Sequence, residues 1–375
     1  MDKIVKFIDL DVPITKCNLK CHYCYVMKNN VRDTADTIFK YTPEHIGRAL
    51  TQERLGGICH FNMCGHGETL IPKEVIQITR EILNNGHYLM IVTNGLLSNR
   101  IKELIEMPMT LRERLGFKFS FHYLELLRTN QMDVFFNNIR MVREAGCSFS
   151  VELTPSDELI PYISDVKNKM MDELGALCHV TVPRDGNSGE IPLMSKLPIE
   201  KFKQIWSEFE SPLFEFKLST WGIKRKEFCY AGAWTGLLNL GDGEMYACYG
   251  SRIHTNVFRN LDKPVNFQAV GKHCSQPHCY NCHSFLTFGT IPDMGDDLPT
   301  YAEMRNRTDK FGNWLNPLMY QSMSQKLYDN NELYSLKQVK HTDRIYQISR
   351  GMSFLKKFPD KIKWEIEKRS KRREN

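Results

Sequence analysis

The sequence predicts an α/β fold, in which a partial (β/α)6 TIM-like barrel is followed by a small cysteine-rich domain and a helical C-terminal tail. Three observations lead to this fold class. Short β-branched runs alternate with longer helical patterns through the first half of the 375 residues, which is typical of β-α units around parallel strands. These units number six, too few to close an eight-stranded barrel. Finally, eight of the 12 cysteines fall into two groups, one early and one late in the chain.

Six runs have the length and residue types of buried strands. They are Ile4–Val12, Ile58–Met63, Tyr88–Thr93, Phe117–Tyr123, Ser148–Leu153 and Cys178–Val182. Prolines, caps and glycines mark the ends of the helices between them. The expected helices begin at Pro43 behind the cap Thr42, run from Pro72 to Gly86, and cover 132–145 and 155–174. An open sheet with helices on both faces would use the same elements and is the alternative architecture.

Polar and cysteine-rich segments divide the rest of the chain. The stretch Arg184–Pro198 is dense in Gly, Pro, Ser and Asn, and we expect it to leave the barrel as a linker. A cysteine-bearing unit follows, and a second polar stretch, Ile291–Thr300, leads to C-terminal helices. The expected domains are 1–185 for the barrel, 186–212 for a linker and helix, 213–290 for the cysteine-rich domain and 291–375 for the C-terminal extension.

Composition excludes several classes of protein. With 42% hydrophobic and 25% charged residues, the chain is neither disordered nor fibrous. It has no run of roughly 20 mostly apolar residues, the length that crosses a bilayer. The run Ile4–Val12 alternates charged and apolar residues, so we expect no signal sequence and a cytoplasmic protein. Clustered cysteines in such a chain bind metal more often than they form disulfides.

The net charge of +6 comes mostly from the C-terminus. Residues 356–375 contain nine Lys or Arg and four Asp or Glu. A solvated helix end is the simplest interpretation of this basic tail. Contact with RNA is an alternative, and the apolar residues among the lysines also permit weak docking on a membrane surface.

The first cysteine group has the spacing C-x3-C-x2-C and follows the first expected strand. Cys17, Cys21 and Cys24 can wrap one metal centre, but only His22, inside the loop itself, offers a fourth ligand nearby. Structural zinc sites need four ligands. A 4Fe-4S cluster can instead be held by three cysteines, which leaves one iron open to bind another molecule. Loops after barrel strands are also where catalytic sites are built.

This motif, with Tyr23 before its last cysteine, resembles the radical S-adenosylmethionine (SAM) superfamily. The resemblance implies a 4Fe-4S cluster on Cys17, Cys21 and Cys24, whose open iron binds SAM. An electron from the reduced cluster then cleaves SAM to a 5'-deoxyadenosyl radical, which abstracts hydrogen from a substrate. Cluster potentials reach about −700 mV, low enough for this reduction. An external one-electron reductant such as flavodoxin or ferredoxin is also implied.

A second motif follows the second expected strand. The segment Cys64–Leu70, which reads CGHGETL, is similar to the family's GGEP stretch that binds the amino group of SAM. Glycine lets the backbone approach a ligand, and a carboxylate suits an ammonium. The resemblance therefore implicates Gly67 and Glu68 in SAM binding. Two positions depart from the family pattern, since His66 replaces its first glycine and Thr69 its proline.

Two more motifs follow the third and fourth expected strands. Thr93-Asn94-Gly95 resembles the family's TNG turn, which implicates Thr93 and Asn94 in SAM binding. Ser120 and His122 end the fourth strand, where the family places polar groups near the ribose. Ordinary strand-end polarity is the alternative for these last two residues. The order of the motifs down successive strand ends supports the resemblance, which covers roughly residues 1 to 185.

The second cysteine group begins with the pattern Cys-x13-Gly-x4-Cys, from Cys229 to Cys248. The turn Gly241-Asp242-Gly243 lies between two apolar runs and is a strong hairpin signal. The remaining members are Cys274, Cys279 and Cys282. This arrangement resembles the SPASM and shorter twitch extensions of radical SAM enzymes, which carry auxiliary iron-sulfur clusters.

Five thiols are too few for two further clusters, so we expect one auxiliary 4Fe-4S cluster. Its ligands are assigned as Cys229, Cys248, Cys279 and Cys282, with Cys274 as a spare or as a substitute for Cys279. A structural zinc ion on the same four residues is the alternative, because paired cysteines on hairpins also bind zinc.

Together the two groups imply a radical SAM oxidoreductase in which the auxiliary cluster accepts the second electron. The first cysteine stands at residue 17, without room for a leader-binding domain before it, which favours a carbohydrate or other small-molecule substrate, or a peptide delivered by a separate partner. Three alternatives are a maturase that modifies ribosomal peptides or proteins, an enzyme that modifies RNA, and a non-catalytic Fe-S or zinc scaffold.

Overall fold

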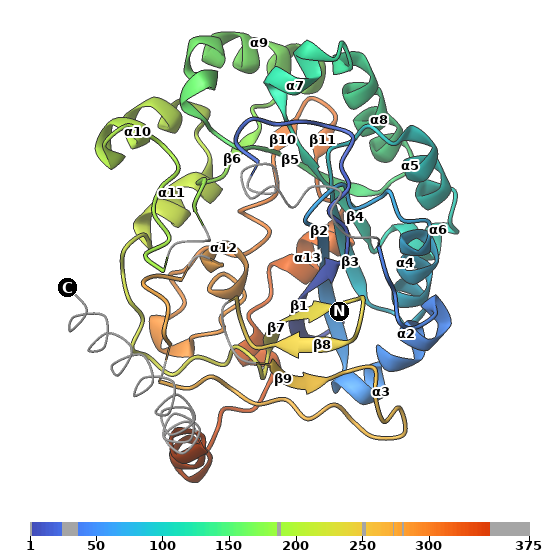
Figure 1. The fold of residues 1–375 in the computed structure, drawn as a ribbon, viewed down its shortest axis with the longest axis vertical. Helices are drawn as coiled ribbons and strands as arrows, with labels where there is room; N and C mark the ends of the chain where they lie inside the picture. Colours follow the sequence, from blue (N-terminus) through green and yellow to red (C-terminus); the bar gives the residue numbers. More distant parts are fainter. Residues whose placement is uncertain are drawn as a thin grey trace, which may run out of the picture.

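The computed structural model describes residues 2–24, 37–185, 189–249, 253–272, 274–279 and 281–345. Its centre is a nine-stranded sheet in the order β6-β5-β4-β3-β2-β1-β7-β8-β9, counted within these residues (Figure 1). The first six strands are β1 (Ile4–Val12), β2 (Ile58–Gly65), β3 (Tyr88–Thr93), β4 (Leu115–Ser120), β5 (Ser148–Leu153) and β6 (His179–Val180). They pair in parallel and in chain order. The predicted α/β fold built around parallel strands is thereby confirmed.

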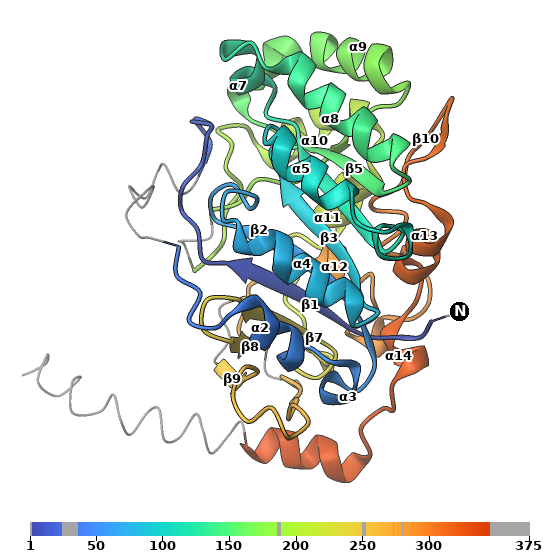
Figure 2. The ribbon, with the colours of Figure 1, turned by 90° about the vertical axis from the view of Figure 1, so that its right-hand side faces the viewer.

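Helices connect these strands and form an outer arc around the sheet (Figures 1 and 2). They are α2 (Pro43–Ala49), α3 (Gln52–Leu55), α4 (Glu74–Asn84), α5 (Ser98–Ile105), α6 (Met109–Arg112), α7 (Tyr123–Arg128), α8 (Met132–Glu144), the 3-10 helix η1 (Asp157–Tyr162) and α9 (Ile163–Leu174). As predicted, Thr42 caps α2, since its hydroxyl accepts a hydrogen bond from the amide of His45.

Three predicted elements differ from the structure. The fourth strand ends at Ser120, and the expected strand residue Tyr123 instead begins α7, because the amide of Leu126 bonds to the carbonyl of His122 in a helical turn. The expected helix 155–174 is divided into η1 and α9. Pro161 lies at the division and has no amide hydrogen to donate, so a continuous α-helix cannot form there. The sixth strand keeps only two residues.

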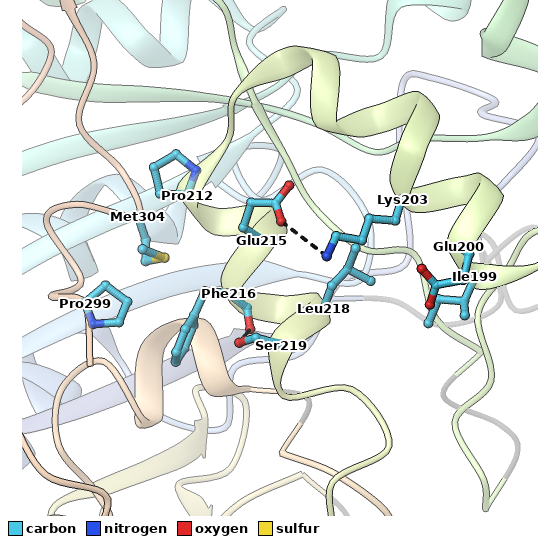
Figure 3. A pocket seen from close by; sticks show the side chains of 10 residues that line it. All are labelled: Ile199, Glu200, Lys203, Pro212, Glu215, Phe216, Leu218, Ser219, Pro299 and Met304. Carbon is cyan, nitrogen blue, oxygen red and sulfur yellow. Dashed lines mark hydrogen bonds and ion pairs between the residues drawn. The ribbon is translucent and has the colours of Figure 1, made fainter. Parts of the chain in front are cut away.

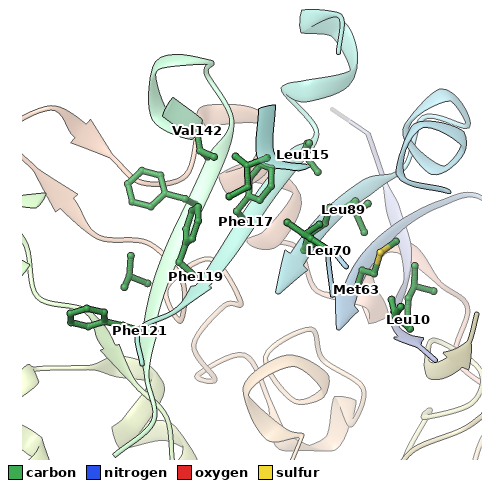
Figure 4. Packing of buried hydrophobic residues seen from close by; sticks show 14 of the residues in the cluster. Leu10, Met63, Leu70, Leu89, Leu115, Phe117, Phe119, Phe121 and Val142 are labelled. Atoms are coloured by element: carbon green, nitrogen blue, oxygen red, sulfur yellow. The ribbon is translucent and has the colours of Figure 1, made fainter. Parts of the chain in front are cut away.

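The two faces of the sheet differ in polarity. Successive side chains of a strand point to opposite faces. Apolar side chains such as Leu10, Met63 and Leu89 point towards the helices and form the main core with them (Figure 4). The other face is mixed: Phe7, Tyr88 and Met90 belong to a second apolar cluster there, while Asp9 and Asn62 stand opposite each other in register. We call this second face the inner face of the sheet.

The predicted hairpin extends the same sheet. Strand β7 (Thr235–Asn239) pairs in parallel with β1, and β8 (Glu244–Tyr246) returns antiparallel to it. Gly243 in the turn has φ +79°, and a Cβ there would lie 2.5 Å from Phe258, so glycine is required on both counts. Strand β9 (Ile253–Asn256) completes the sheet. The cysteine-bearing segment is thus joined to the first strand of the barrel.

The remaining elements cover the open side and the amino ends of the strands (Figures 1 and 2). They are α10 (Ile199–Trp206), η2 (Ser207–Phe209), α11 (Pro212–Ser219), α12 (Cys282–Phe285), η3 (Pro292–Met294), the pair β10 (Thr308–Asp309) and β11 (Gly312–Asn313), α13 (Pro317–Met323) and α14 (Leu327–Asn330). The ring of Trp314 stacks on that of Phe149 at 5.1 Å. The basic tail from 356 to 375 lies outside the described residues. In the part that is described, no helix is long and apolar enough to cross a membrane.

Candidate functional site

The first cysteine group lies on a loop at the carboxyl end of β1. The amide of Cys24 donates to the carbonyl of Cys21 at 3.1 Å, which turns the loop back on itself. None of these three cysteines is in a disulfide, and Cys21 is buried. Burial, with smaller contributions from the nearby Glu125, Cys17 and Cys24, raises the pKa of Cys21 to about 12. The structure therefore brings the three predicted ligands together on one loop.

The loop after β2 packs directly on this cysteine loop. The amide of Gly67 donates to the carbonyl of Ile14, and that of Glu68 to the carbonyl of Lys16, both at 2.8 Å. A Cβ at position 67 would lie 2.0 Å from the Lys16 oxygen. Gly67 is thus required for the contact between the two loops, a role that the sequence motif alone did not reveal.

Glu68 joins the second and third motifs. Its buried carboxylate accepts hydrogen bonds from Thr93 Oγ1 at 2.7 Å, from the Asn94 amide at 2.8 Å and from the Leu70 amide at 3.1 Å. Burial raises the pKa of Glu68, while these three donors lower it in part. The carboxylate fixes the Thr93-Asn94 turn, and Asn94 Nδ2 in turn donates to Cys17 Sγ at 3.8 Å.

Residues after β4 and β5 hold the other side of the cysteine loop. Tyr23 Oη lies 2.5 Å from His122 Nδ1, and burial lowers the pKa of His122 to about 4, so the neutral imidazole accepts the phenol hydrogen. Glu125 of α7 accepts from the Lys20 amide at 2.9 Å. His22 Nε2 lies 3.1 Å from the hydroxyl of Ser156, after β5. The loops after β2, β3, β4 and β5 therefore each contribute a contact.

Ser120 is the last residue of β4, beside Glu152 of β5 in the sheet register. It is half-buried and lies on the inner face. The structure thus brings His122 to the cysteine loop through Tyr23 and leaves Ser120 on the neighbouring part of the sheet.

The first cysteine group fits a three-thiolate iron-sulfur cluster by its donor set. Its members are three sulfur ligands within one loop, the ligand type that such clusters use. Three sulfur ligands are one fewer than a structural zinc site uses. Among residues that the structure describes, no three Cys, His, Asp or Glu side chains converge closely enough to hold a single metal ion.

The second cysteine group gathers around α12. Cys229 pairs with Gly271 through two backbone hydrogen bonds, and the Cys282 amide donates to the Cys279 carbonyl at 3.1 Å. Burial raises the pKa of Cys279, and Cys282, Cys248, Cys229 and Cys274 raise it further. The other four cysteines of the group thus all affect the pKa of Cys279.

A polar contact that the sequence did not predict holds α12 against the sheet. Asp9 of β1 accepts hydrogen bonds from Asn62 Nδ2 at 2.7 Å and from Asn281 Nδ2 at 2.9 Å. Burial raises the pKa of Asp9. Since Asn281 precedes Cys282, this contact places the second cysteine group on the inner face, inside the arc of helices (Figure 1). The sequence signal that could have indicated this contact is Asp9 itself, an aspartate in the middle of a buried strand.

A separate hollow of about 460 Å3 lies between α10, α11 and the segment 299–304 (Figure 3). The Nζ of Lys203 and the carboxylate of Glu215 face each other across it at 4.0 Å. None of the predicted site residues lines this hollow.

The comparison with protein families explains the first group of motifs. Residues 12–155 match the family described as the radical SAM superfamily. These residues are thus similar to a radical SAM domain. The domain contains the cysteine loop and the strand-end loops that hold it, and it supports the prediction that the protein is an enzyme. No curated protein matches the sequence.

The solved structures that are similar to this chain include three that match at low sequence identity. SuiB of Streptococcus suis bound to S-adenosylmethionine is 13% identical over 70% of this chain, with a TM-score of 0.49. The match spans 65% of the length of SuiB. The protein anSMEcpe with bound AdoMet is 16% identical, and the match covers 71% of this chain and 77% of anSMEcpe, with a TM-score of 0.44. BtrN in complex with AdoMet and 2-DOIA is 14% identical, and the match covers 70% of this chain and 82% of BtrN, with a TM-score of 0.39.

Proposed function

We propose that this protein is a radical SAM oxidoreductase that acts on a carbohydrate, another small molecule or a peptide. The observation that carries the proposal is the position of Cys17, Cys21 and Cys24 within the matched residues 12–155, on a loop that is held by the loops carrying the proposed SAM-binding motifs. When bound, a reduced 4Fe-4S cluster supplies the electron that cleaves SAM to a 5'-deoxyadenosyl radical. A flavodoxin or ferredoxin is proposed as the external reductant.

In this proposal Cys17, Cys21 and Cys24 hold the cluster through their thiolates. Asn94 donates to Cys17 Sγ and restrains that ligand. The carboxylate of Glu68 already accepts three hydrogen bonds from the protein. Glu68 therefore serves SAM binding by fixing the backbone of its own loop and of the Thr93-Asn94 turn.

The Tyr23–His122 pair orients the face of the loop next to α7. Because the phenol donates to the imidazole, His122 keeps Nε2 for a further partner such as a ribose hydroxyl. Ser120, on the inner face, is proposed to contribute to the same part of the site. Both residues would thus orient SAM on the side of the sheet where the substrate must bind.

The second cysteine group is proposed to hold an auxiliary 4Fe-4S cluster that accepts the second electron of a two-electron oxidation. Its proposed ligands are Cys229, Cys248, Cys279 and Cys282, with Cys274 in place of Cys279 as the variant assignment. Support comes from the mutual effect of these thiols on their pKa values and from the position of α12 on the inner face. A zinc ion on the same residues would hold the structure but accept no electron.

The test is anaerobic reconstitution of the full chain, followed by assay of iron, sulfide and 5'-deoxyadenosine formed from SAM with dithionite. We expect about eight irons per chain if both groups bind 4Fe-4S clusters, and about four irons with one zinc if the second group binds zinc. Cys17→Ala, Cys21→Ala or Cys24→Ala should abolish 5'-deoxyadenosine formation, whereas Cys147→Ala, outside both groups, should not. Wild-type protein that carries iron yet forms no 5'-deoxyadenosine would contradict the proposal.

A further inference from the structure

The carboxylate of Asp11 lies on the inner face of the sheet, between the two cysteine groups. Successive side chains of a strand point to opposite faces. Leu10 of β1 points towards the helices (Figure 4), so its neighbours Asp9 and Asp11 point to the inner face. Asp9 is held by Asn281, the residue before Cys282. Asp11 stands two residues, or about 6–7 Å, further along β1, towards the cysteine loop that follows the strand.

Asp11 forms an ion pair with the imidazole of His66. His66 Nε2 lies 3.5 Å from Asp11 Oδ1. The family motif has glycine at the position of His66, so the pair depends on a side chain that the motif lacks. The side chains of Asp11 and His66 are 24% and 56% exposed, so a small molecule on this face can reach both.

Strands β1 to β6 carry two other carboxylates, and both have fixed partners. Asp9 accepts hydrogen bonds from two asparagine amides, at 2.7 and 2.9 Å. Glu152 forms an ion pair with the guanidinium of Arg305. Neither carboxylate can accept a proton from a substrate without weakening these contacts. Asp11 differs because its partner is an imidazole and because it is open to solvent.

The groups beside Asp11 do not compete with it as proton acceptors. Cys64 stands next to it in the sheet register, and its thiol donates to a backbone carbonyl. Burial raises the pKa of Cys64 to about 12, so the thiol stays protonated. Asn239 of β7 stands on the other side and accepts from a backbone amide. Asp242, in the turn after β7, pairs with Lys40 at 3.7 Å.

The surroundings of Asp11 also give it the proton affinity of a base. Burial raises the pKa of Asp11 to about 6, Asp9 and Asp242 add to this rise, and His66 opposes it. The phenol of Tyr249 is influenced by Asp11 and stays protonated, because burial raises the pKa of Tyr249. A general base works best when its pKa lies near the working pH. Asp11 is therefore ionised at neutral pH and ready to accept a proton.

We infer that Asp11 is the general base that removes the proton of a substrate hydroxyl group, and that His66 is its positioning residue. The inference rests on the proposed function and narrows the substrate to an alcohol, such as a sugar or a polyol. A neutral hydroxyl fits better than an ammonium, because the imidazole beside the carboxylate can itself carry a positive charge and would repel a second cation.

The step balances as the oxidation of an alcohol to a carbonyl. The carbon that bears the hydroxyl loses a hydrogen atom, which converts the 5'-deoxyadenosyl radical to 5'-deoxyadenosine. The O–H bond breaks, and its proton passes to the carboxylate of Asp11. The remaining electron passes to the proposed auxiliary cluster, and the C–O bond becomes a double bond. Asp11 thus accounts for the proton, as the two cysteine groups account for the hydrogen atom and the electron.

Binding of the SAM ammonium is the competing role for Asp11, since the loop after β2 carries a proposed SAM-binding motif. The same repulsion by His66 disfavours that ammonium. The two roles also differ in their consequences. Loss of a SAM contact lowers the affinity for SAM, whereas loss of the base lowers only the formation of the oxidised product.

The first measurement is the modification of Asp11 by a water-soluble carbodiimide and taurine between pH 5 and pH 7.5, read by peptide mass spectrometry on the reconstituted full chain. Carbodiimides react with protonated carboxyl groups, so Asp11 should give a midpoint near pH 6. His66→Gln should move the midpoint to higher pH, because His66 lowers the pKa of Asp11. A midpoint below pH 5, or one that His66→Gln leaves in place, would overturn the pairing.

The second measurement supplies myo-inositol, methyl glucoside, methyl glucosaminide and a serine-containing tripeptide, each with SAM and dithionite. Carbonyl product, 5'-deoxyadenosine and SAM affinity are measured together. Wild-type protein should form a carbonyl from at least one of these hydroxyl probes. Asp11→Asn should form it about a hundredfold more slowly or less, since a general base commonly contributes that much, with unchanged affinity for SAM. Asp133→Asn, on the exposed side of α8, is the matched control and should behave like wild type.

The outcomes separate this inference from the proposed function. Carbonyl formation at the wild-type rate in Asp11→Asn would overturn the inference. So would wild-type protein that forms 5'-deoxyadenosine but no carbonyl from any probe. A tenfold loss of SAM affinity in Asp11→Asn would assign the carboxylate to SAM and overturn it as well. Wild-type protein without 5'-deoxyadenosine would refute the proposed function, whereas the carbodiimide result would still stand.

Discussion

Gly67→Ala tests whether the contact between the two loops positions the cysteine ligands. The added Cβ would lie 2.0 Å from the Lys16 carbonyl oxygen and 2.7 Å from its carbon. These are backbone atoms, so the loops themselves must move apart. The movement disturbs two hydrogen bonds, from Gly67 to Ile14 and from Glu68 to Lys16. At about 0.5–1.5 kcal/mol each, their loss would lower the free energy of unfolding by about 1–3 kcal/mol.

The same movement would displace Cys17, which follows Lys16 directly. We therefore expect Gly67→Ala to reconstitute with less iron and to form 5'-deoxyadenosine at a rate at least about tenfold lower, since misplaced catalytic groups commonly cost that much or more. Urea unfolding, iron content and 5'-deoxyadenosine formation are measured together. Gly189→Ala is the control, because its Cβ would meet no atom within 4 Å. Normal iron content and turnover in Gly67→Ala would refute the positioning role.

Three further predictions concern buried polar groups. Glu68→Gln leaves one acceptor oxygen for three donors, and it should weaken SAM binding about tenfold in equilibrium dialysis; unchanged affinity would exclude the positioning role of the carboxylate. The imidazole of His87 accepts a hydrogen bond from the Cys59 amide, and burial lowers the pKa of His87 from 6.5 to about 4. Between these two pH values the unfolded chain binds a proton that the folded chain does not. The free energy of unfolding should therefore fall by about 3 kcal/mol between pH 6.5 and pH 4. His87→Gln should lose that part of the pH dependence, and an identical pH profile would count against it. Asn281→Ala leaves an oxygen of Asp9 without its donor. This variant should bind less iron at the second cysteine group while SAM cleavage persists. An equal loss of bound iron and of SAM cleavage would show that the Asn281 contact does not support the second cysteine group separately.

Much of the barrel could be predicted because its signals are local. Strands β1, β3 and β5 have the predicted bounds, since β3 is an apolar run, β1 and β5 alternate apolar with polar residues, and polar or turn residues follow each strand. The expected helix 155–174 is divided at Pro161, and the missing amide hydrogen of this proline could have been used to predict the division. The early end of β4 has another cause. Tyr123 has the composition of a strand residue, but it forms the first residue of α7.

Contacts between distant segments could not be predicted from the sequence. The motif around Glu68 was recognised, yet its carboxylate is bonded to a turn 25 residues later, so its positioning role is visible only in the structure. The pairing of β7 with β1 joins segments more than 200 residues apart, and no local pattern specifies it.

The central claim is that Cys17, Cys21 and Cys24 hold a cluster with one iron open to SAM. It is tested most directly by the electron paramagnetic resonance spectrum of the dithionite-reduced protein before and after SAM is added. The Cys279→Ala variant is the better sample, because removal of a proposed auxiliary ligand simplifies the signal. We expect SAM to shift the spectrum, and we expect no such shift in a variant that also carries Cys17→Ala. A reduced cluster whose spectrum is the same with and without SAM would contradict the account.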